Sequence, residues 1–274
     1  MGAHAENGGV VLALAASRVG HLRDSLNSTH VNRIRALLKP FAPDVGQRND
    51  ATREQWLEEA LKQVPPGTRI LDAGAGTQRY RKFCQHLRYV SQDIAEYDGQ
   101  GDATGLQTGN FDFGKLDIVS DIGAIPEPDG SFGAIMCIEV FEHLPDPLVA
   151  VREFGRLLAP GGTLIITSPF ASLTHFAPYH FCSGFNRYWY EAHLPAAGFT
   201  ALQIVPNGNY FEFIAQELYR LPSVAKRYAG RRTGPITSLS MYLLLRALSR
   251  YSRADTHSSE LLYFGSHVLA RKAE

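Results

Sequence analysis

The chain has 274 residues, of which 45% are hydrophobic and 20% are charged. These values are ordinary for a globular protein and exclude a low-complexity or fibrous chain. Lys and Arg together number 27, and Asp and Glu also number 27, so the chain as a whole lacks the excess of basic residues typical of nucleic-acid-binding proteins. The length suits one large domain or a domain with an appendage.

The cysteines and an apolar stretch near the N-terminus bear on location. Cys84, Cys137 and Cys182 are far apart in the sequence and form no CxxC pair. We therefore predict neither a disulfide framework nor a zinc site, and we expect a reducing, cytoplasmic setting. Residues 9–16 are apolar, but the stretch is too short to cross a bilayer, and no Lys or Arg precedes it as in a secretion signal.

The pattern of apolar residues predicts helices and strands in alternation. In chain order the predicted elements are a helix at 28–38, a helix at 50–64, a strand at 69–72, a helix at 78–87, strands at 89–92, 116–120 and 134–138, a helix at 148–158, a strand at 163–167, a helix at 187–197, a strand at 201–206, helices at 210–229 and 236–253, and a strand at 261–270. Such alternation builds a parallel sheet with helices on both faces. We therefore predict a Rossmann-like α/β domain over 49–274, preceded by an N-terminal helical extension over 1–48 and carrying a basic helical insertion over 223–253 before the last strand.

The segment ILDAGAGTQRY places two glycines directly after the first strand of the predicted sheet. Gly74 permits a tight turn after Asp72, and Gly76 lets a ligand approach the main chain closely. The helix expected next would point its N-terminal N–H groups at the same place, which suits an anionic group. A dinucleotide fingerprint requires a third glycine where this chain has Arg79, so the pattern argues against a nicotinamide or flavin cofactor.

Acidic residues also end the next two predicted strands. Asp93 ends the second strand, where a carboxylate accepts two hydrogen bonds from the hydroxyls of a ribose. Asp121, followed by Ile122, ends the third strand, where an acid accepts an amino proton of a base and an apolar side chain packs on that base. Because ligands bind at the carboxyl ends of parallel strands, we expect these residues and the glycine loop to form one site.

The motifs LDAGAG, SQD, SDI, CIEVFEHLPDP and LAPGGTL, in this order over about residues 67–205, resemble the type 11 branch of the class I S-adenosylmethionine-dependent methyltransferases. The resemblance implies a seven-stranded, mostly parallel sheet whose last strand is antiparallel, and S-adenosylmethionine as the cofactor. It implies these cofactor-binding residues: Asp72, Gly74 and Gly76 for the methionine part, Asp93 for the ribose, Asp121 and Ile122 for the adenine, and Ile138 and Glu139 beside the sulfonium. Gly133 departs from the family, whose members usually carry Asp at that position.

Methyl transfer to a hydroxyl also needs a group that removes one proton. His143 directly follows the fourth predicted strand, and His180 lies in the segment after the fifth. We predict that these two histidines are the catalytic bases, because His143 directly follows a strand at the ligand end and His180 lies where members of the family carry substrate-facing residues. His175, in the same segment as His180, is a weaker third candidate.

Glu139, Glu142 and His143 form an ExxEH pattern whose oxygen and nitrogen atoms suit a divalent metal. The spacing resembles that of ubiquinone-pathway O-methyltransferases and small-RNA 2′-O-methyltransferases, both linked with magnesium. Many members of the type 11 branch carry EHLPDP without such a role, and we favour a hydrogen-bonded structural network here. No metal is therefore included in the predicted site.

The segment 169–190 is rich in aromatic residues and histidines, and it follows the fifth strand at the mouth of the expected site. Aromatic faces accompanied by His, Asn and Arg suit a sugar or an aromatic ring. We therefore expect O-methylation of a sugar, a glycan precursor or another small molecule. An N- or C-methyltransferase and a non-catalytic scaffold that keeps the cofactor are the alternatives.

Residues 223–253 carry seven Lys or Arg and no acid. This basic charge, together with the apolar run ITSLSMYLLLRALSRY, allows peripheral contact with an anionic membrane. The interpretation we favour is an insertion whose helices pack on the sheet with their charges in water. Nucleic acid is not expected as a partner, since no RNA-binding module accompanies the basic residues.

Overall fold

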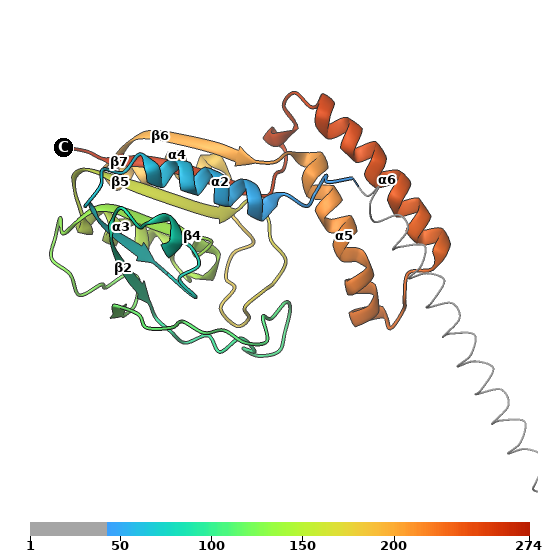
Figure 1. Ribbon diagram of the computed structural model, residues 1–274, viewed down its shortest axis with the longest axis horizontal. Helices are drawn as coiled ribbons and strands as arrows, with labels where there is room; N and C mark the ends of the chain where they lie inside the picture. Colours follow the sequence, from blue (N-terminus) through green and yellow to red (C-terminus); the bar gives the residue numbers. More distant parts are fainter. Residues whose placement is uncertain (1–42) are drawn as a thin grey trace, which may run out of the picture.

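A computed structural model describes residues 43–274 of the chain. The helix predicted at 28–38 and most of the predicted N-terminal extension lie outside the described residues. The remainder of the chain forms a single sheet with helices on both faces and a helical hairpin beyond one end of it (Figure 1).

The sheet has seven strands in the order β3-β2-β1-β4-β5-β7-β6. Their bounds are β1 Arg69–Ala73, β2 Arg88–Asp93, β3 Ile118–Val119, β4 Phe132–Ile138, β5 Leu158–Pro169, β6 Phe199–Asn207 and β7 Gly265–Lys272. Neighbouring strands from β3 to β5 are parallel, whereas β7 lies antiparallel to both β5 and β6. The predicted fold, with an antiparallel last strand inserted into a parallel sheet, is confirmed.

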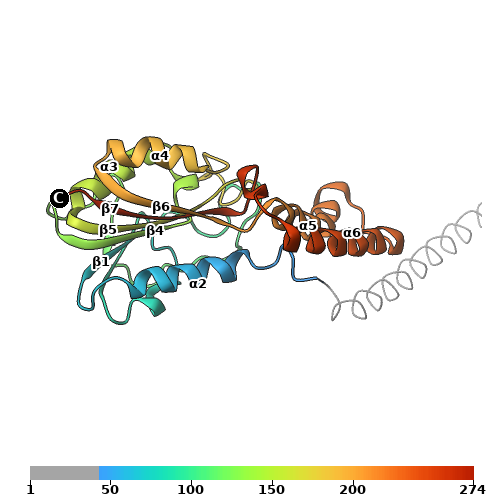
Figure 2. The same cartoon turned by 90° about the horizontal axis from the view of Figure 1, so that it is seen from above.

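Three helices cover the sheet. Helix α2 (Asn49–Lys62) lies on one face, and α3 (Pro147–Leu157) and α4 (Arg187–Ala196) lie on the other, as Figure 2 shows. Each face has its own apolar core: buried leucines of α2 pack on one side of β1 and β4, and buried side chains of α3 and α4 pack on the other side. Burial on both faces explains the near-continuous apolar runs of the central strands.

Local sequence signals set the start of two of these helices. The side chain of Asp146 accepts a hydrogen bond from the N–H of Leu148, and Pro147 takes the first helical position of α3. The side chain of Asn186 accepts hydrogen bonds from the N–H groups of Tyr188 and Trp189 at the start of α4. The cap of α3 comes after the segment that follows β4, and the cap of α4 comes after the segment that follows β5. The caps therefore fix where each segment ends and the chain turns into a helix.

The helix predicted at 78–87 is wrong. The structure has only turns and a short 3-10 helix, η2 (Arg81–Phe83), in this segment. Gln78 has a φ of 56°, which no α-helix accommodates, and its side-chain amide donates hydrogen bonds to the carbonyls of Phe113 and Lys115, both at 2.9 Å. The glycine loop therefore lacks the helix N-terminus that was expected to face an anionic group.

Two long helices, α5 (Tyr210–Ala229) and α6 (Pro235–Ala254), precede β7, as predicted. They pack against each other and on Val45 through Ala215, Leu245 and Leu248. Figures 1 and 2 show this hairpin extending away from the sheet, so the prediction that the insertion packs on the sheet is wrong. No helix between residues 43 and 274 combines the length and hydrophobicity that a bilayer crossing requires.

Candidate active site

A cavity of about 690 Å³ opens at the carboxyl ends of β1, β2 and β4. It is lined by every residue predicted to bind the cofactor, namely Asp72, Gly74, Gly76, Asp93, Asp121, Ile122, Ile138 and Glu139. His143 lines the same cavity, whereas His180 does not, although its neighbours Tyr179 and Phe181 do. The structure thus brings the strand-end motifs and one predicted base together around one space.

The glycine loop after β1 is closely packed. The N–H groups of Gly74 and Ala75 donate to the carbonyl oxygen of Gln92 on β2, at 2.9 and 2.8 Å. Gly74 has a φ of 74°, and a Cβ placed on it would lie 2.6 Å from a methyl carbon of Val140. Gly76 has a φ of 49°, and its Cβ would lie 3.2 Å from the Phe111 ring. Glycine is required at both places, and the bare main chain of Gly76 faces the cavity.

Asp93 joins the end of β2 to the glycine loop. Its Oδ2 accepts the N–H of Gly76 at 2.9 Å, and its Oδ1 accepts the N–H of Ala95 at 3.0 Å. Each carboxylate oxygen has two lone pairs, so both retain capacity for a ligand hydroxyl. Asp121 accepts the N–H of Gly123 at 2.6 Å and is exposed, while Ile122 beside it is half-buried.

Asp72 is buried at the end of β1, and its carboxylate accepts the hydroxyl of Tyr89 at 2.5 Å. Burial, with a further contribution from the Asp93 carboxylate, raises the pKa of Asp72 to about 7, although the Tyr89 hydroxyl opposes the shift. This carboxyl group therefore keeps its proton to a higher pH than an exposed aspartate does. Asp72 lies in β1 just before the glycine loop, and it lines the cavity.

Arg53 of α2 lines the cavity and was not predicted as a site residue. Its guanidinium pairs with Glu139 Oε2 at 3.0 Å and with Asp50 Oδ1 at 2.5 Å, while its buried Nε has no hydrogen-bond partner among the described residues. Burial opposes the charge of Arg53, but Glu139, Tyr80 and Asp50 together outweigh burial and raise the pKa of Arg53, so the group is a permanent cation. The available signal was an arginine on the same helix face as the apolar Leu57 and Ala60.

Glu139 occupies an uncommon backbone position at the end of β4. Its φ is 56°, rare for a residue with a side chain, and such conformations gather at functional sites. Its Oε1 accepts the hydroxyl of Thr167 at 2.8 Å, and its Oε2 pairs with Arg53. The Glu139 carboxylate is thereby held between Thr167 of β5 and Arg53 of α2. The trio of Glu139, Glu142 and His143 considered from the sequence is not assembled.

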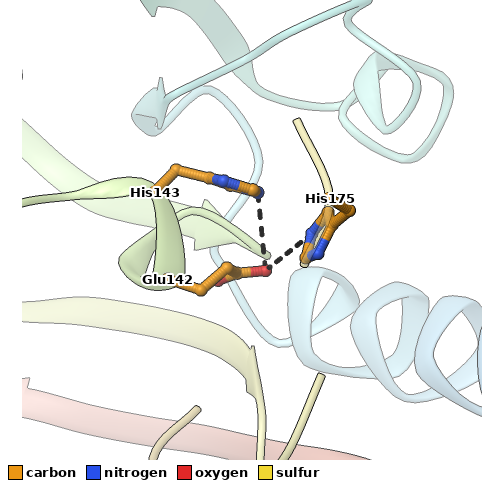
Figure 3. A group of neighbouring side chains, drawn as sticks. All are labelled: Glu142, His143 and His175. Carbon is orange, nitrogen blue, oxygen red and sulfur yellow. Dashed lines mark ion pairs between the residues drawn. The ribbon is translucent and has the colours of Figure 1, made fainter. Parts of the chain in front are cut away.

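Glu142 lies instead beside His143 and His175, as Figure 3 shows. Its Oε1 is 3.7 Å from Nε2 of His143 and 3.9 Å from Nε2 of His175, and one ligand atom from each residue lies within 4.8 Å of the others. The Nδ1 atoms donate to the carbonyls of Tyr179 and Leu173, at 2.6 and 2.8 Å, since a carbonyl only accepts. Nε2 of each ring is consequently the nitrogen that lies near the Glu142 carboxyl group.

The electrostatics of this group follow from its burial. Glu142 is only 1% exposed and its Oε2 has no partner among the described residues. Burial, with a contribution from Glu139, raises the pKa of Glu142 well above its usual range. Burial, with a contribution from His175, lowers the pKa of His143 to about 4. Two imidazole nitrogens and one carboxyl oxygen form a donor set that suits a proton or a divalent cation.

His180 lies next to the group formed by Glu142, His143 and His175 but does not line the cavity. Its Nε2 shares a hydrogen bond with the Ser172 hydroxyl at 3.1 Å, and its ring centre is 4.8 Å from that of His175 and 6.1 Å from that of His143. Partial burial, with a contribution from His175, lowers the pKa of His180. His180 is therefore placed to support the other histidines, and its predicted role as a base stays a prediction.

Aromatic rings form a continuous wall from the glycine loop to His143. Phe111 lies 5.6 Å from Phe176, and Phe176 stacks on both Tyr97 at 4.5 Å and His143 at 5.1 Å. Tyr97 and Phe111 come from the segment between β2 and β3, which sequence reasoning missed as part of the site. The visible signal was a set of aromatic residues in an otherwise polar, glycine-rich stretch.

The model of a family described as methyltransferase domain matches residues 45–220. The chain belongs to this family. This methyltransferase uses S-adenosylmethionine as its cofactor, and the family region contains the glycine loop, Asp93, Asp121 and the Glu142 group. The cavity fits that cofactor on its own terms, because the bare main chain of Gly76, the cationic side chain of Arg53 and the carboxylate of Asp93 line one space.

The methyltransferase resembles several known enzymes in part. Ubiquinone biosynthesis O-methyltransferases of Xanthomonas campestris pv. campestris (strain B100) and Xanthomonas oryzae pv. oryzae (strain PXO99A) are each 34% identical to it, over 113 and 106 residues. These matches cover 40% and 37% of the chain and 46% and 43% of the relatives, so the chain spans less than half the length of the curated relatives it matches.

Solved structures show a weaker likeness. A SAM-dependent methyltransferase from Archaeoglobus fulgidus is 16% identical with a TM-score of 0.49, covering 81% of this chain and 94% of that one. Phosphoethanolamine N-methyltransferase 2 of Haemonchus contortus is 15% identical with a TM-score of 0.48, covering 81% of this chain and 53% of that one. Similarities of this size say nothing about the acceptor.

Proposed function

We propose that this methyltransferase transfers a methyl group to a hydroxyl oxygen of a small molecule, either a sugar, a glycan precursor or a compound with an aromatic ring. The observation that carries the proposal is one cavity that joins the predicted cofactor residues at one end to His143 and a row of aromatic rings at the other. A donor and an acceptor bound in such a space meet without water between them.

At the cofactor end, Asp93 holds the ribose hydroxyls, and Asp121 and Ile122 hold the adenine. Arg53 and the main chain of the glycine loop hold the methionine part, with the Arg53 guanidinium supplying the positive charge that the absent helix N-terminus does not. Ile138 and Glu139 follow β4 and lie beside the reacting sulfur. The cofactor supplies a methyl group on a cationic sulfur, which leaves as a neutral thioether.

At the acceptor end, His143 is neutral at physiological pH and is the proposed base. The acceptor oxygen forms a bond to the methyl carbon as the carbon–sulfur bond breaks, and the hydroxyl proton passes to Nε2 of His143. The oxygen becomes strongly acidic as its new bond forms, so an imidazole with a pKa of about 4 is basic enough. The carbonyl of Tyr179, which accepts the Nδ1 proton, holds the His143 ring and favours its charged form.

The choice of a small hydroxylated acceptor is supported by two observations. Phe176, Tyr97 and Phe111 give the cavity an aromatic wall against which a planar or sugar ring packs. The partial similarity to enzymes named ubiquinone biosynthesis O-methyltransferase favours oxygen over nitrogen or carbon as the methylated atom. The similarity covers 40% of the chain, so it supports the reaction class and not the identity of the acceptor.

A transfer assay tests the proposal. The full chain is incubated with methyl-labelled S-adenosylmethionine and a panel of catechols, phenols and sugars, and the methylated atom is identified by NMR. We expect O-methyl products with some members and a loss of at least 100-fold in kcat for His143→Gln. His257→Gln, at an exposed histidine outside the cavity, is the matched control. Cofactor binding without transfer to any acceptor class would favour the scaffold alternative, and N- or C-methyl products would replace the oxygen assignment.

A further inference from the structure

The α5–α6 hairpin presents a surface that the methyltransferase reaction does not use. On the inner side of α6, Leu245 and Leu248 are buried against α5. On its outer side, Ile236, Leu239 and Leu243 are 84%, 54% and 59% exposed. Exposure of this extent is costly for large aliphatic side chains gathered on one helix, and it marks an interaction surface.

The exposed residues of α6 are arranged for a flat, charged partner. Ile236, Leu239 and Leu243 recur three or four residues apart, so they lie on one face, and Arg250 continues that face about two turns beyond Leu243. Arg246 and Arg253 lie along one edge of the same face. We call this set the outer face of α6: Ile236, Leu239, Leu243, Arg246, Arg250 and Arg253.

The charge around this face is one-sided. The stretch 223–253 contains seven Lys or Arg and no acid, and none of the seven forms a salt bridge within residues 43–274. Lys226 and Arg227 near the end of α5 and Arg231 and Arg232 in the connection add cations at the tip of the hairpin. Apolar side chains interleaved with cations that have no acidic partner suit a binding partner whose interior is apolar and whose surface is anionic.

Other occupants fit this charge pattern less well. A second copy of the chain, meeting the same face in a symmetric dimer, would bury the arginines of both copies with no acid on either face to pair with them. Residues 1–42 of the chain contain five Lys or Arg and two acids, so they carry no excess of negative charge to offset this face. Nucleic acid matches the cations but leaves Ile236, Leu239 and Leu243 exposed to water.

We propose that the outer face of α6 binds to the surface of an anionic lipid bilayer. The helix lies in the plane of the interface, with Ile236, Leu239 and Leu243 among the lipid chains and the arginines among the headgroups. Each cation near an anionic surface strengthens partition by about fivefold at low salt. The proposal rests on the hairpin alone and stands whether or not the acceptor assignment is right.

Co-sedimentation of the full chain with vesicles tests the proposal. We compare vesicles of phosphatidylcholine alone with vesicles of phosphatidylcholine and phosphatidylglycerol. We expect binding only to the anionic vesicles, weakened by added salt. Arg246→Gln with Arg250→Gln should lower the partition coefficient by about 25-fold, and Leu239→Ser with Leu243→Ser should lower it at least tenfold.

The matched control removes the same charge elsewhere. Lys62→Gln with Arg187→Gln changes two exposed cations of the catalytic domain, each paired with an acid one helical turn away, and should change partition less than threefold. Circular dichroism verifies that each variant is folded. Equal binding to both vesicle types, no binding, or an equal loss in the control pair would overturn the proposal. A concentration-dependent dimer that the leucine variants abolish would also overturn it, because a second copy would then cover the face.

Discussion

Replacing Asp93 with alanine is the most direct test of the cofactor site. The carboxylate accepts the N–H groups of Gly76 and Ala95 at 2.9 and 3.0 Å and has lone pairs left for two ribose hydroxyls. A hydrogen bond to a charged acceptor contributes about 1.5–3 kcal/mol. Losing two at the lower end of that range costs about 3 kcal/mol, which weakens the dissociation constant for S-adenosylmethionine by roughly 150-fold.

Isothermal titration with S-adenosylmethionine and with S-adenosylhomocysteine measures the effect. Asp98→Ala is the matched control, because Asp98 Oδ1 also accepts two backbone N–H groups, from Gln100 and Gly101, but lies outside the cavity. We expect the control to bind within threefold of the unmodified chain. If Asp93→Ala binds within fivefold of the unmodified chain while its thermal unfolding is unchanged, the ribose is not held there and the assignment fails.

Other residues give further expectations. Arg53→Met should weaken cofactor binding at least tenfold and lower Tm, and adding Glu139→Gln should restore Tm but not binding, as titration and thermal unfolding would show. Gly74→Ala should weaken binding, and Val140→Ala should recover part of the loss, because its methyl groups lie 2.6 and 2.9 Å from the added Cβ. Burial, with a contribution from Arg53, lowers the pKa of His267 to about 4. The unfolded histidine titrates near 6.5, so the native protein loses stability as pH falls from about 6.5 towards 4. His267→Phe removes this loss. In urea titrations, the difference in unfolding free energy between the variant and the unmodified chain should therefore be about 2 kcal/mol more favourable to the variant at pH 5 than at pH 7.5. Chelation by EDTA should leave transfer unchanged, whereas loss with recovery on adding a divalent cation would assign a metal to Glu142, His143 and His175.

The fold was predictable because its signals are local. Strands such as β4 are continuous apolar runs, and helices such as α3 begin at a cap that four or five residues define. The error at 78–87 has a different origin. Gln78 takes a positive φ and bonds to the carbonyls of Phe113 and Lys115, which are more than thirty positions away in the chain, and no local pattern reports such contacts.

The two ends of the site differ in the same way. The strand-end residues predicted to bind the cofactor come together because parallel strands deliver their carboxyl ends to one edge, so Gly76 and Asp93 meet by topology. Arg53 was missed because its place depends on how α2 packs. His175 reaches Glu142 through long connections, which are tied together by the pairing of Leu106 with His175. The positions of Arg53 and His175 depend on tertiary contacts, and they cannot be predicted from the spacing of residues in the sequence.

The ExxEH pattern shows how one unusual backbone angle separates two roles. On a regular helix, Glu139 and Glu142 would lie on the same face. The positive φ of Glu139 instead turns the chain, and a short 3-10 helix, η3 (Phe141–His143), carries the second acid away. Glu139 then pairs with Arg53 at the proposed cofactor end of the cavity, while Glu142 lies beside the histidines at the proposed acceptor end. It follows that Glu139→Gln should act mainly on the KM for S-adenosylmethionine, and Glu142→Gln mainly on kcat and the acceptor. Equal effects of both variants on both substrates would contradict this division.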